Sequence, residues 1–192
     1  RLKTGVGKVQ TVADHPYMNK DVSFLRIIDT RGIEFDKTYG PEEILKKTLE
    51  IIDNQNKGNK GSNKDKGNKE NEYNDYVQCI WYCISNNGID SKDIDIIKGL
   101  IRGKENIPLI VVFTYGYNEE SIKKAENEIK SKLPNIPFIA TLSKNVNIGN
   151  KILESYGLDD LIKKTTEVCK NAIKGDVFNA IKDKISKEIT KR

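Results

Sequence analysis

The feature that most constrains the fold is a run of seven residues without a charged side chain, from Ile107 to Phe113 (IPLIVVF). Strands with one solvated face alternate apolar and polar residues, whereas parallel strands buried on both faces are apolar throughout. The run therefore predicts a strand inside a parallel sheet. Three further apolar segments of strand length predict its companions: 23–29 (SFLRIID), 76–84 (YVQCIWYCI) and 136–141 (IPFIAT).

Amphipathic segments separate these strands. Residues 41–52, 91–102, 119–132 and 157–173 carry apolar side chains at helical spacing. Strands that alternate with helices predict an α/β fold of three layers, a mostly parallel sheet with helices on both faces. Ligands of such sheets bind beyond the carboxyl ends of the strands. The loops that follow the strands are therefore where a site is expected.

Two segments differ from this pattern. Residues 54–75 (NQNKGNKGSNKDKGNKENEYND) offer almost nothing to bury and predict a disordered insertion in a surface loop. Residues 174–192 are rich in lysine, with apolar residues spaced by four, and predict an amphipathic helix. We therefore expect one domain over 1–173 and a separate helix over 174–192. That helix suits packing; contact with anionic lipid or nucleic acid is the alternative.

Composition narrows the class of protein. The net charge of +5 is spread along the whole chain, so we expect no nucleic-acid partner, and a membrane contact only through 174–192. Cys79, Cys83 and Cys169 are too few and too scattered for a disulfide framework. Cys79 and Cys83 lie four residues apart in one apolar strand, roughly 13 Å, too far to bridge, and are expected to be core thiols in a reducing cytoplasm. His15 is the only histidine, and no apolar run approaches the ~20 residues that span a bilayer.

The segment Asp29-Thr30-Arg31-Gly32 directly follows the apolar strand 23–29. An acid at a strand's carboxyl end can hold Mg²⁺, and a glycine lets its backbone N–H approach a terminal phosphate. This D-x-x-G pattern therefore predicts a phosphate and metal site. A turn initiated by Asp29 is the structural alternative.

With this motif and the order of the elements after it, the chain resembles the G domain of P-loop GTPases, in the class of translation factors, Era and septins. The resemblance covers roughly residues 5–173 apart from the insertion. The segment 76–84 resembles the strand that follows the switch II helix in that class. The resemblance implies a guanine nucleotide, GTP or GDP, bound with Mg²⁺.

The resemblance also implies roles for seven residues. Thr11 matches the switch I threonine, which ligates Mg²⁺ and senses the terminal phosphate, although an ordinary loop threonine is the alternative. Asp29 matches the D-x-x-G acid, a second metal ligand, and Gly32 matches its glycine. The implied base-binding residues, at the positions of the N/T-K-x-D and S-A-K motifs, are Thr114, Tyr115, Ser143 and Lys144.

The chain departs from the family in three places. Tyr117 stands where the guanine-reading aspartate is expected, and Ile33 where Ras-like proteins place the glutamine that orients water. No G-x-x-x-x-G-K-S/T loop occurs: the segment 4–9 (TGVGKV) lacks the first glycine and ends in Val9 instead of serine or threonine. We therefore expect the phosphate-binding loop to lie upstream of Arg1, and this piece alone to bind nucleotide poorly.

The expected function is binding of GTP and its hydrolysis to GDP and phosphate, as a cytoplasmic switch that acts on an unidentified effector or regulator protein. Tyr117 and the absent phosphate loop favour the alternative, a non-catalytic G-like interaction module. Catalytic residues are not assigned by either interpretation.

Overall fold

The computed structural model describes residues 15–19, 22–29, 40–58, 77–85 and 88–172. Within them, a parallel sheet has the order β3-β4-β5, formed by β3 (Ile80–Ile84), β4 (Leu109–Phe113) and β5 (Phe138–Ala140). All five residues of β4 are buried, because this strand has a neighbour on each edge and helices over each face. The prediction of an α/β fold with a buried parallel strand is confirmed.

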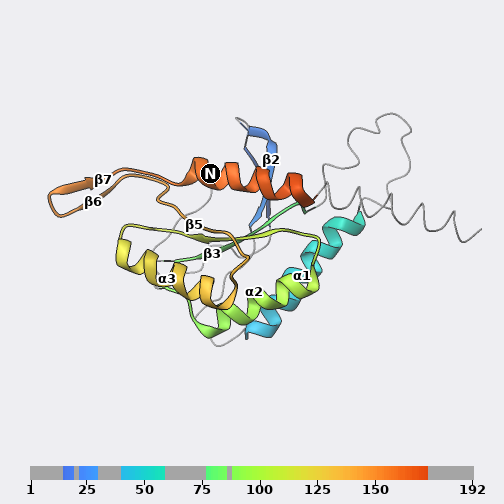
Figure 1. Cartoon of the computed structure of the whole chain (residues 1–192). Coiled ribbons are helices and arrows are strands. Elements are labelled where there is room, and N and C mark those ends of the chain that lie inside the picture. The colour runs from blue at the N-terminus through green and yellow to red at the C-terminus, as the bar shows by residue number, and fades with distance from the viewer. Residues whose placement is uncertain (1–14, 20–21, 30–39, 59–76, 86–87, 173–192) are drawn as a thin grey trace, which may run out of the picture.

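The two faces of β4 belong to two apolar clusters, because successive side chains of a strand point to opposite faces. Figure 1 shows α2 (Ser91–Gly103) and α3 (Glu119–Lys132) on one side of the sheet and a helix over residues 158–172 on the other. The larger cluster lies under α2 and α3 and includes Leu109, Val111, Phe113, Ile97 and Ile129. The smaller one lies under the 158–172 helix and consists of Ile110, Val112 and Leu161, with Trp81, Cys79, Ile139 and Val168 packed against them.

Helix α1 (Pro41–Gly58) packs against α2. Its Leu45 and Leu49 lie directly against the α2 backbone at Gly99 and Gly103, where no side chain intervenes. The helix also includes residues 54–58, which the sequence assigned to a disordered insertion, and that boundary is corrected. One contact supports this end of the helix: the Asn56 side chain accepts a hydrogen bond from the N–H of Val77 at 3.1 Å. Residues 59–76 lie outside the described part.

The strand predicted over 23–29 exists as β2 (Val22–Asp29), but its place in the sheet was wrong. It pairs antiparallel with β1 (His15–Asn19) in a separate two-stranded sheet, with His15 opposite Asp29. The sequence did not predict β1, which supplies a partner only a few residues away, and a short hairpin connection closes at little entropic cost. Residues 1–14, 30–39 and 173–192 lie outside the described part, so the predicted helix over 174–192 remains untested.

A second hairpin, also not predicted, follows β5. Its strands are β6 (Val146–Ile148) and β7 (Lys151–Leu153), and Ile148 pairs with Lys151 across a two-residue turn. The turn begins at Gly149 with φ +59°, a left-handed conformation suited to two-residue hairpins. Figure 1 shows the hairpin extending away from the sheet. Strands of three residues are too short for periodicity to reveal.

Candidate functional site

The candidate site lies at the carboxyl end of the parallel sheet, where the loops after β4 and β5 meet. The β4 loop starts at Thr114, whose N–H and hydroxyl both donate to the carbonyl of Ile84, at 2.8 and 3.0 Å. These two hydrogen bonds hold the end of β4 beside the end of β3. Thr114 is half-buried and its hydroxyl hydrogen is engaged, so it serves the loop's conformation.

Gly116 joins the two loops. Its N–H donates to the carbonyl of Thr141 at 3.0 Å, and its own carbonyl accepts from the Tyr156 hydroxyl at 2.6 Å. A Cβ at this position would lie 2.5 Å from that hydroxyl oxygen and 3.4 Å from the Thr141 carbonyl oxygen. Glycine is therefore needed here for close approach. The bond to Thr141 brings together the two segments that the resemblance assigned to the nucleotide base.

Two tyrosines project from the β4 loop. Tyr115 adopts φ +57°, uncommon for a residue with a side chain, and the N–H of Tyr117 donates to its carbonyl at 2.8 Å, which closes a tight turn. Tyr115 is 53% exposed and Tyr117 44% exposed. A strained backbone that displays two aromatic rings is a feature found at ligand sites.

The β5 loop is held on both sides. Thr141 is buried, and its N–H donates to the Phe113 carbonyl at 2.8 Å. Leu142 and Tyr156 exchange a reciprocal pair of backbone hydrogen bonds, both 3.0 Å long. Ser143 and Lys144 follow directly and are exposed. Their positions on a fixed backbone leave these side chains open to a ligand above the sheet edge.

Tyr156 and Gly157, which the sequence did not single out, complete the site. Burial raises the pKa of the Tyr156 phenol, and the negative charge of Glu119 raises it further, so the hydroxyl stays protonated and donates to Gly116. Gly157 has φ +81°, and a Cβ there would collide with the carbonyl oxygen of Ala140. For Gly157, the sequence offered one signal, a glycine directly before a helix. For Tyr156 it offered none, because a hydrogen bond to a backbone carbonyl 40 residues away has no sequence pattern.

The structure does not test the residues predicted for metal and phosphate. Thr11 and Gly32 lie outside the described residues. Asp29 ends β2, in the separate hairpin. Among the residues that the structure describes, no group of three or more His, Cys, Asp or Glu side chains could hold a metal ion. The Mg²⁺ site at Thr11 and Asp29 therefore stays a prediction.

The residues that the resemblance assigns to the base combine aromatic rings with a positive charge and lack the guanine-reading carboxylate. Exposed tyrosines offer stacking surfaces, and Lys144 adds a positive charge, but Tyr117 has no carboxylate to accept two hydrogen bonds. The nearest acid along the chain is Glu119, in the first turn of α3. The exposed side chains at these loops are therefore two tyrosine rings, a serine hydroxyl and a lysine ammonium group.

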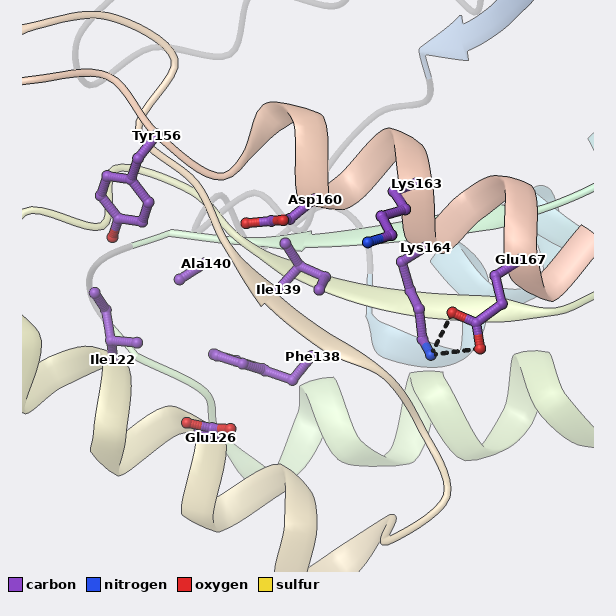
Figure 2. A pocket seen from close by; sticks show the side chains of 10 residues that line it. All are labelled: Ile122, Glu126, Phe138, Ile139, Ala140, Tyr156, Asp160, Lys163, Lys164 and Glu167. Carbon is purple, nitrogen blue, oxygen red and sulfur yellow. Dashed lines mark hydrogen bonds and ion pairs between the residues drawn. The ribbon is translucent and has the colours of Figure 1, made fainter.

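A cavity of about 420 Å³ lies beside β5 instead of above these loops. Figure 2 shows it between α3 and the 158–172 helix, with Phe138, Ile139 and Ala140 along its floor. Tyr156 lines its end, so this ring connects the cavity to the candidate site. None of the predicted nucleotide-binding residues that the structure describes lines the cavity. We place the candidate site at the loops, because converging backbone groups and strained geometry occur there.

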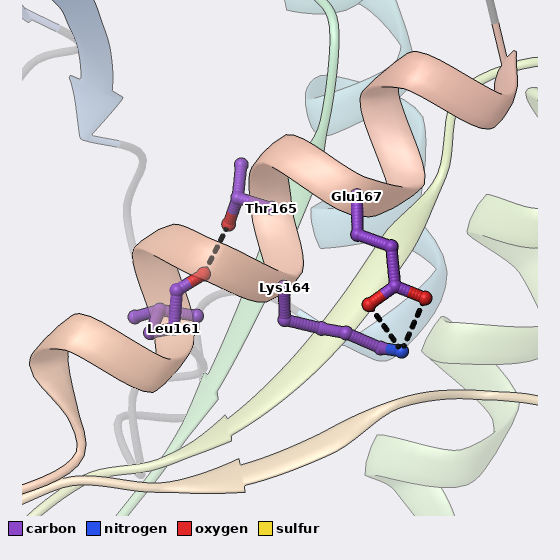
Figure 3. A network of polar contacts seen from close by, with 4 residues as sticks. All are labelled: Leu161, Lys164, Thr165 and Glu167. Carbon is purple, nitrogen blue, oxygen red and sulfur yellow. Dashed lines mark hydrogen bonds and ion pairs between the residues drawn. The ribbon is translucent and has the colours of Figure 1, made fainter.

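The 158–172 helix, which begins next to the site, is anchored by polar contacts as well as by Leu161. The Trp81 indole donates to the Thr165 hydroxyl at 2.9 Å, and that hydroxyl donates to the Leu161 carbonyl at 2.7 Å. On the solvent side, Lys164 contacts both carboxylate oxygens of Glu167 at 3.1 Å (Figure 3). The anchored helix holds Gly157 and Tyr156 in place.

None of the described helices combines the length and the apolar character that crossing a bilayer requires. Comparison with models of known protein families and with curated protein sequences gave no match to this chain. The functional assignment therefore depends on the residues and their arrangement.

Proposed function

We propose that this chain is the base-binding part of a nucleotide-binding domain, most similar in plan to a GTPase G domain. The observation that carries the proposal is the hydrogen bond from Gly116 to Thr141. It joins the two loops that the resemblance assigns to recognition of the base. Both loops lie at the carboxyl end of a parallel sheet, where such folds bind ligands.

In this proposal each loop has a separate task. Tyr115 and Tyr117 provide stacking surfaces, while the exposed Ser143 and Lys144 border the base from the β5 side. Thr114 and Gly116 keep the β4 loop in its strained form. Thr11, Asp29 and Gly32 would bind Mg²⁺ and phosphate, as the resemblance implies, and the metal would neutralise phosphate charge during hydrolysis of GTP to GDP and phosphate in the cytoplasm.

The alternative function is a G-like module that binds an effector or regulator protein without hydrolysis. Its support is the exposure of three apolar side chains at the same sheet end, Tyr115, Tyr117 and Leu158, the last 53% exposed. Large aromatic side chains at a surface are typical anchors of protein interfaces. The two functions differ in whether nucleotide occupies this surface.

The test is a titration of the natural full-length protein with fluorescent GTP and Mg²⁺, with unlabelled GTP and ATP as competitors. We expect Tyr115→Ala to weaken binding by roughly 5- to 150-fold, from a stacking contribution of about 1–3 kcal/mol. The matched control is Ile152→Ala, which removes a 69% exposed side chain on the β7 hairpin strand and should leave affinity unchanged.

A second variant tests the role of position 117. Tyr117→Asp places a carboxylate where it can accept two hydrogen bonds from guanine but not from adenine, so the ratio of GTP to ATP affinity should increase. Absence of nucleotide binding in a folded wild-type protein would reject the nucleotide site and favour the interaction module. If substitutions of Tyr115 and Tyr117 left nucleotide affinity unchanged, the base would bind at a different place from the one proposed.

A further inference from the structure

Two of the three cysteines meet on the face of the sheet that the 158–172 helix covers. Cys79 directly precedes β3 and packs against the smaller apolar cluster, and Cys169 lies on the helix. The Cys169 thiol lies 3.5 Å from the carbonyl oxygen of Gln78, the residue next to Cys79. Each thiol also perturbs the pKa of the other, as expected for two side chains on facing elements. The contact with Gln78 therefore brings Cys169 next to a cysteine 90 residues away in the chain.

The third cysteine has a different environment. Cys83 is exposed, which corrects the prediction of a core thiol, and its thiol contacts the carbonyl of Trp81 at 3.9 Å. Cys79 and Cys169 are half-buried. The fold therefore selects Cys169 as the neighbour of Cys79, although Cys83 is only four residues away in the sequence.

We infer that Cys79 and Cys169 form a redox modification site, in which a small disulfide such as glutathione disulfide oxidises the pair to an internal disulfide. The bond would join the start of β3 to the helix that begins at the candidate site. The inference does not depend on nucleotide binding. It requires that the two sulfurs approach to bonding distance, about 2.05 Å.

The reaction balances in two exchange steps. The Cys169 thiolate attacks one sulfur of glutathione disulfide, which forms a mixed disulfide and releases one glutathione thiolate. The Cys79 thiolate then attacks the Cys169 sulfur and releases the second glutathione thiolate. The two protons lost by the protein thiols end on the two glutathione molecules, so the protein is oxidised by two electrons and glutathione disulfide is reduced to two thiols.

The environment of the two thiols affects the rate of this exchange. Burial raises the pKa of the Cys79 thiol to about 12. Burial also raises the pKa of Cys169, but the hydrogen bond with Cys79 opposes that increase. Because the attacking species in thiol–disulfide exchange is the thiolate, burial slows the exchange at neutral pH, and the oxidation should accelerate as pH rises.

The experiment oxidises the full chain with glutathione disulfide, blocks remaining thiols, and maps the linked peptides by mass spectrometry. We expect Cys79 linked to Cys169 and Cys83 as a glutathione adduct. Cys83→Ser should keep the internal link and its mass loss of two hydrogens. Cys79→Ser and Cys169→Ser should each lose the link and leave the remaining partner as an adduct.

Oxidation of the urea-unfolded wild-type chain is the second measurement and needs no variant. Loop-closure statistics alone favour the nearby Cys83 over Cys169 as partner of Cys79 by roughly 100-fold. The native chain should invert that preference, and the unfolded chain should follow it. A native product that links Cys83, or native protein with all three cysteines as separate adducts, would overturn the inference.

Discussion

Replacing Gly157 with alanine tests the close contact on which the candidate site depends. In the wild type, φ of Gly157 is +81°, and an added Cβ would meet the carbonyl oxygen and carbon of Ala140. The left-handed conformation alone costs an alanine roughly 1–2 kcal/mol. The collision is with backbone in β5, which moves less easily than a side-chain end, and relief of such overpacking costs about 1–3 kcal/mol more.

Gly149→Ala is the matched control. Gly149 also has a positive φ, +59°, but nothing lies within 4 Å of its added Cβ. The free energy of unfolding of this variant should therefore fall only by the roughly 1–2 kcal/mol that the left-handed conformation costs an alanine. The difference between the two variants, about 1–3 kcal/mol, isolates the steric contact with Ala140.

Urea unfolding followed by circular dichroism measures both losses. With a slope of roughly 2 kcal/mol per molar urea, the midpoint should fall by about 1–2.5 M for Gly157→Ala and by about 0.5–1 M for Gly149→Ala. Equal midpoints for the two variants would refute the reasoning, because they would show that β5 and the start of the 158–172 helix do not approach as closely as described.

Three other predictions concern single contacts. Thr165→Val removes the acceptor of the Trp81 indole bond and leaves the N–H half-buried without it, so the free energy of unfolding should fall by about 1–3 kcal/mol in urea titrations. Asp90 caps α2 through bonds to two backbone N–H groups; Asp90→Ala should cost about 0.5–2 kcal/mol, whereas Asp95→Ala on the exposed face of that helix should be near neutral by the same assay. Folding raises the pKa of Cys79 from 9.0 to about 12, so its contribution is complete below pH 9 and is lost as pH rises toward 12. Wild type should therefore lose more stability over that range than Cys79→Ser, and parallel alkaline curves would contradict the assignment.

The sequence predicted those elements whose pattern repeats over enough residues. The apolar run ending at Phe113 and the amphipathic segment 119–132 match β4 and α3, because burial on both faces and helical periodicity leave clear signals. The hairpin strands β6 and β7, three residues each, are too short for such a signal. The partner of β2 was misassigned because an apolar strand does not specify which edge it joins.

The same limit applies to the site. The sheet topology places the loops after β4 and β5 at one end, so their meeting through Gly116 and Thr141 could be predicted. The contribution of Tyr156 could not, since its hydroxyl bonds to a backbone carbonyl that any residue would offer. Cys83 was predicted to be a core thiol because it lies in a long apolar segment. The strand that forms there, β3, is shorter than that segment and is only partly buried, and Cys83 is exposed.

The unequal size of the two apolar clusters has a consequence for local opening. The helix over 158–172 is held by a cluster of three buried residues, while α2 and α3 share the larger one. Partial unfolding begins in the elements that bury the fewest apolar contacts. Backbone amides of the 158–172 helix should therefore exchange with solvent deuterium before those of α2. Such an opening removes the support of Tyr156 while the rest of the sheet stays folded. The carboxyl-end loops would then lose their fixed shape by a partial, reversible detachment, so the shape of the candidate site depends on the stability of this one helix.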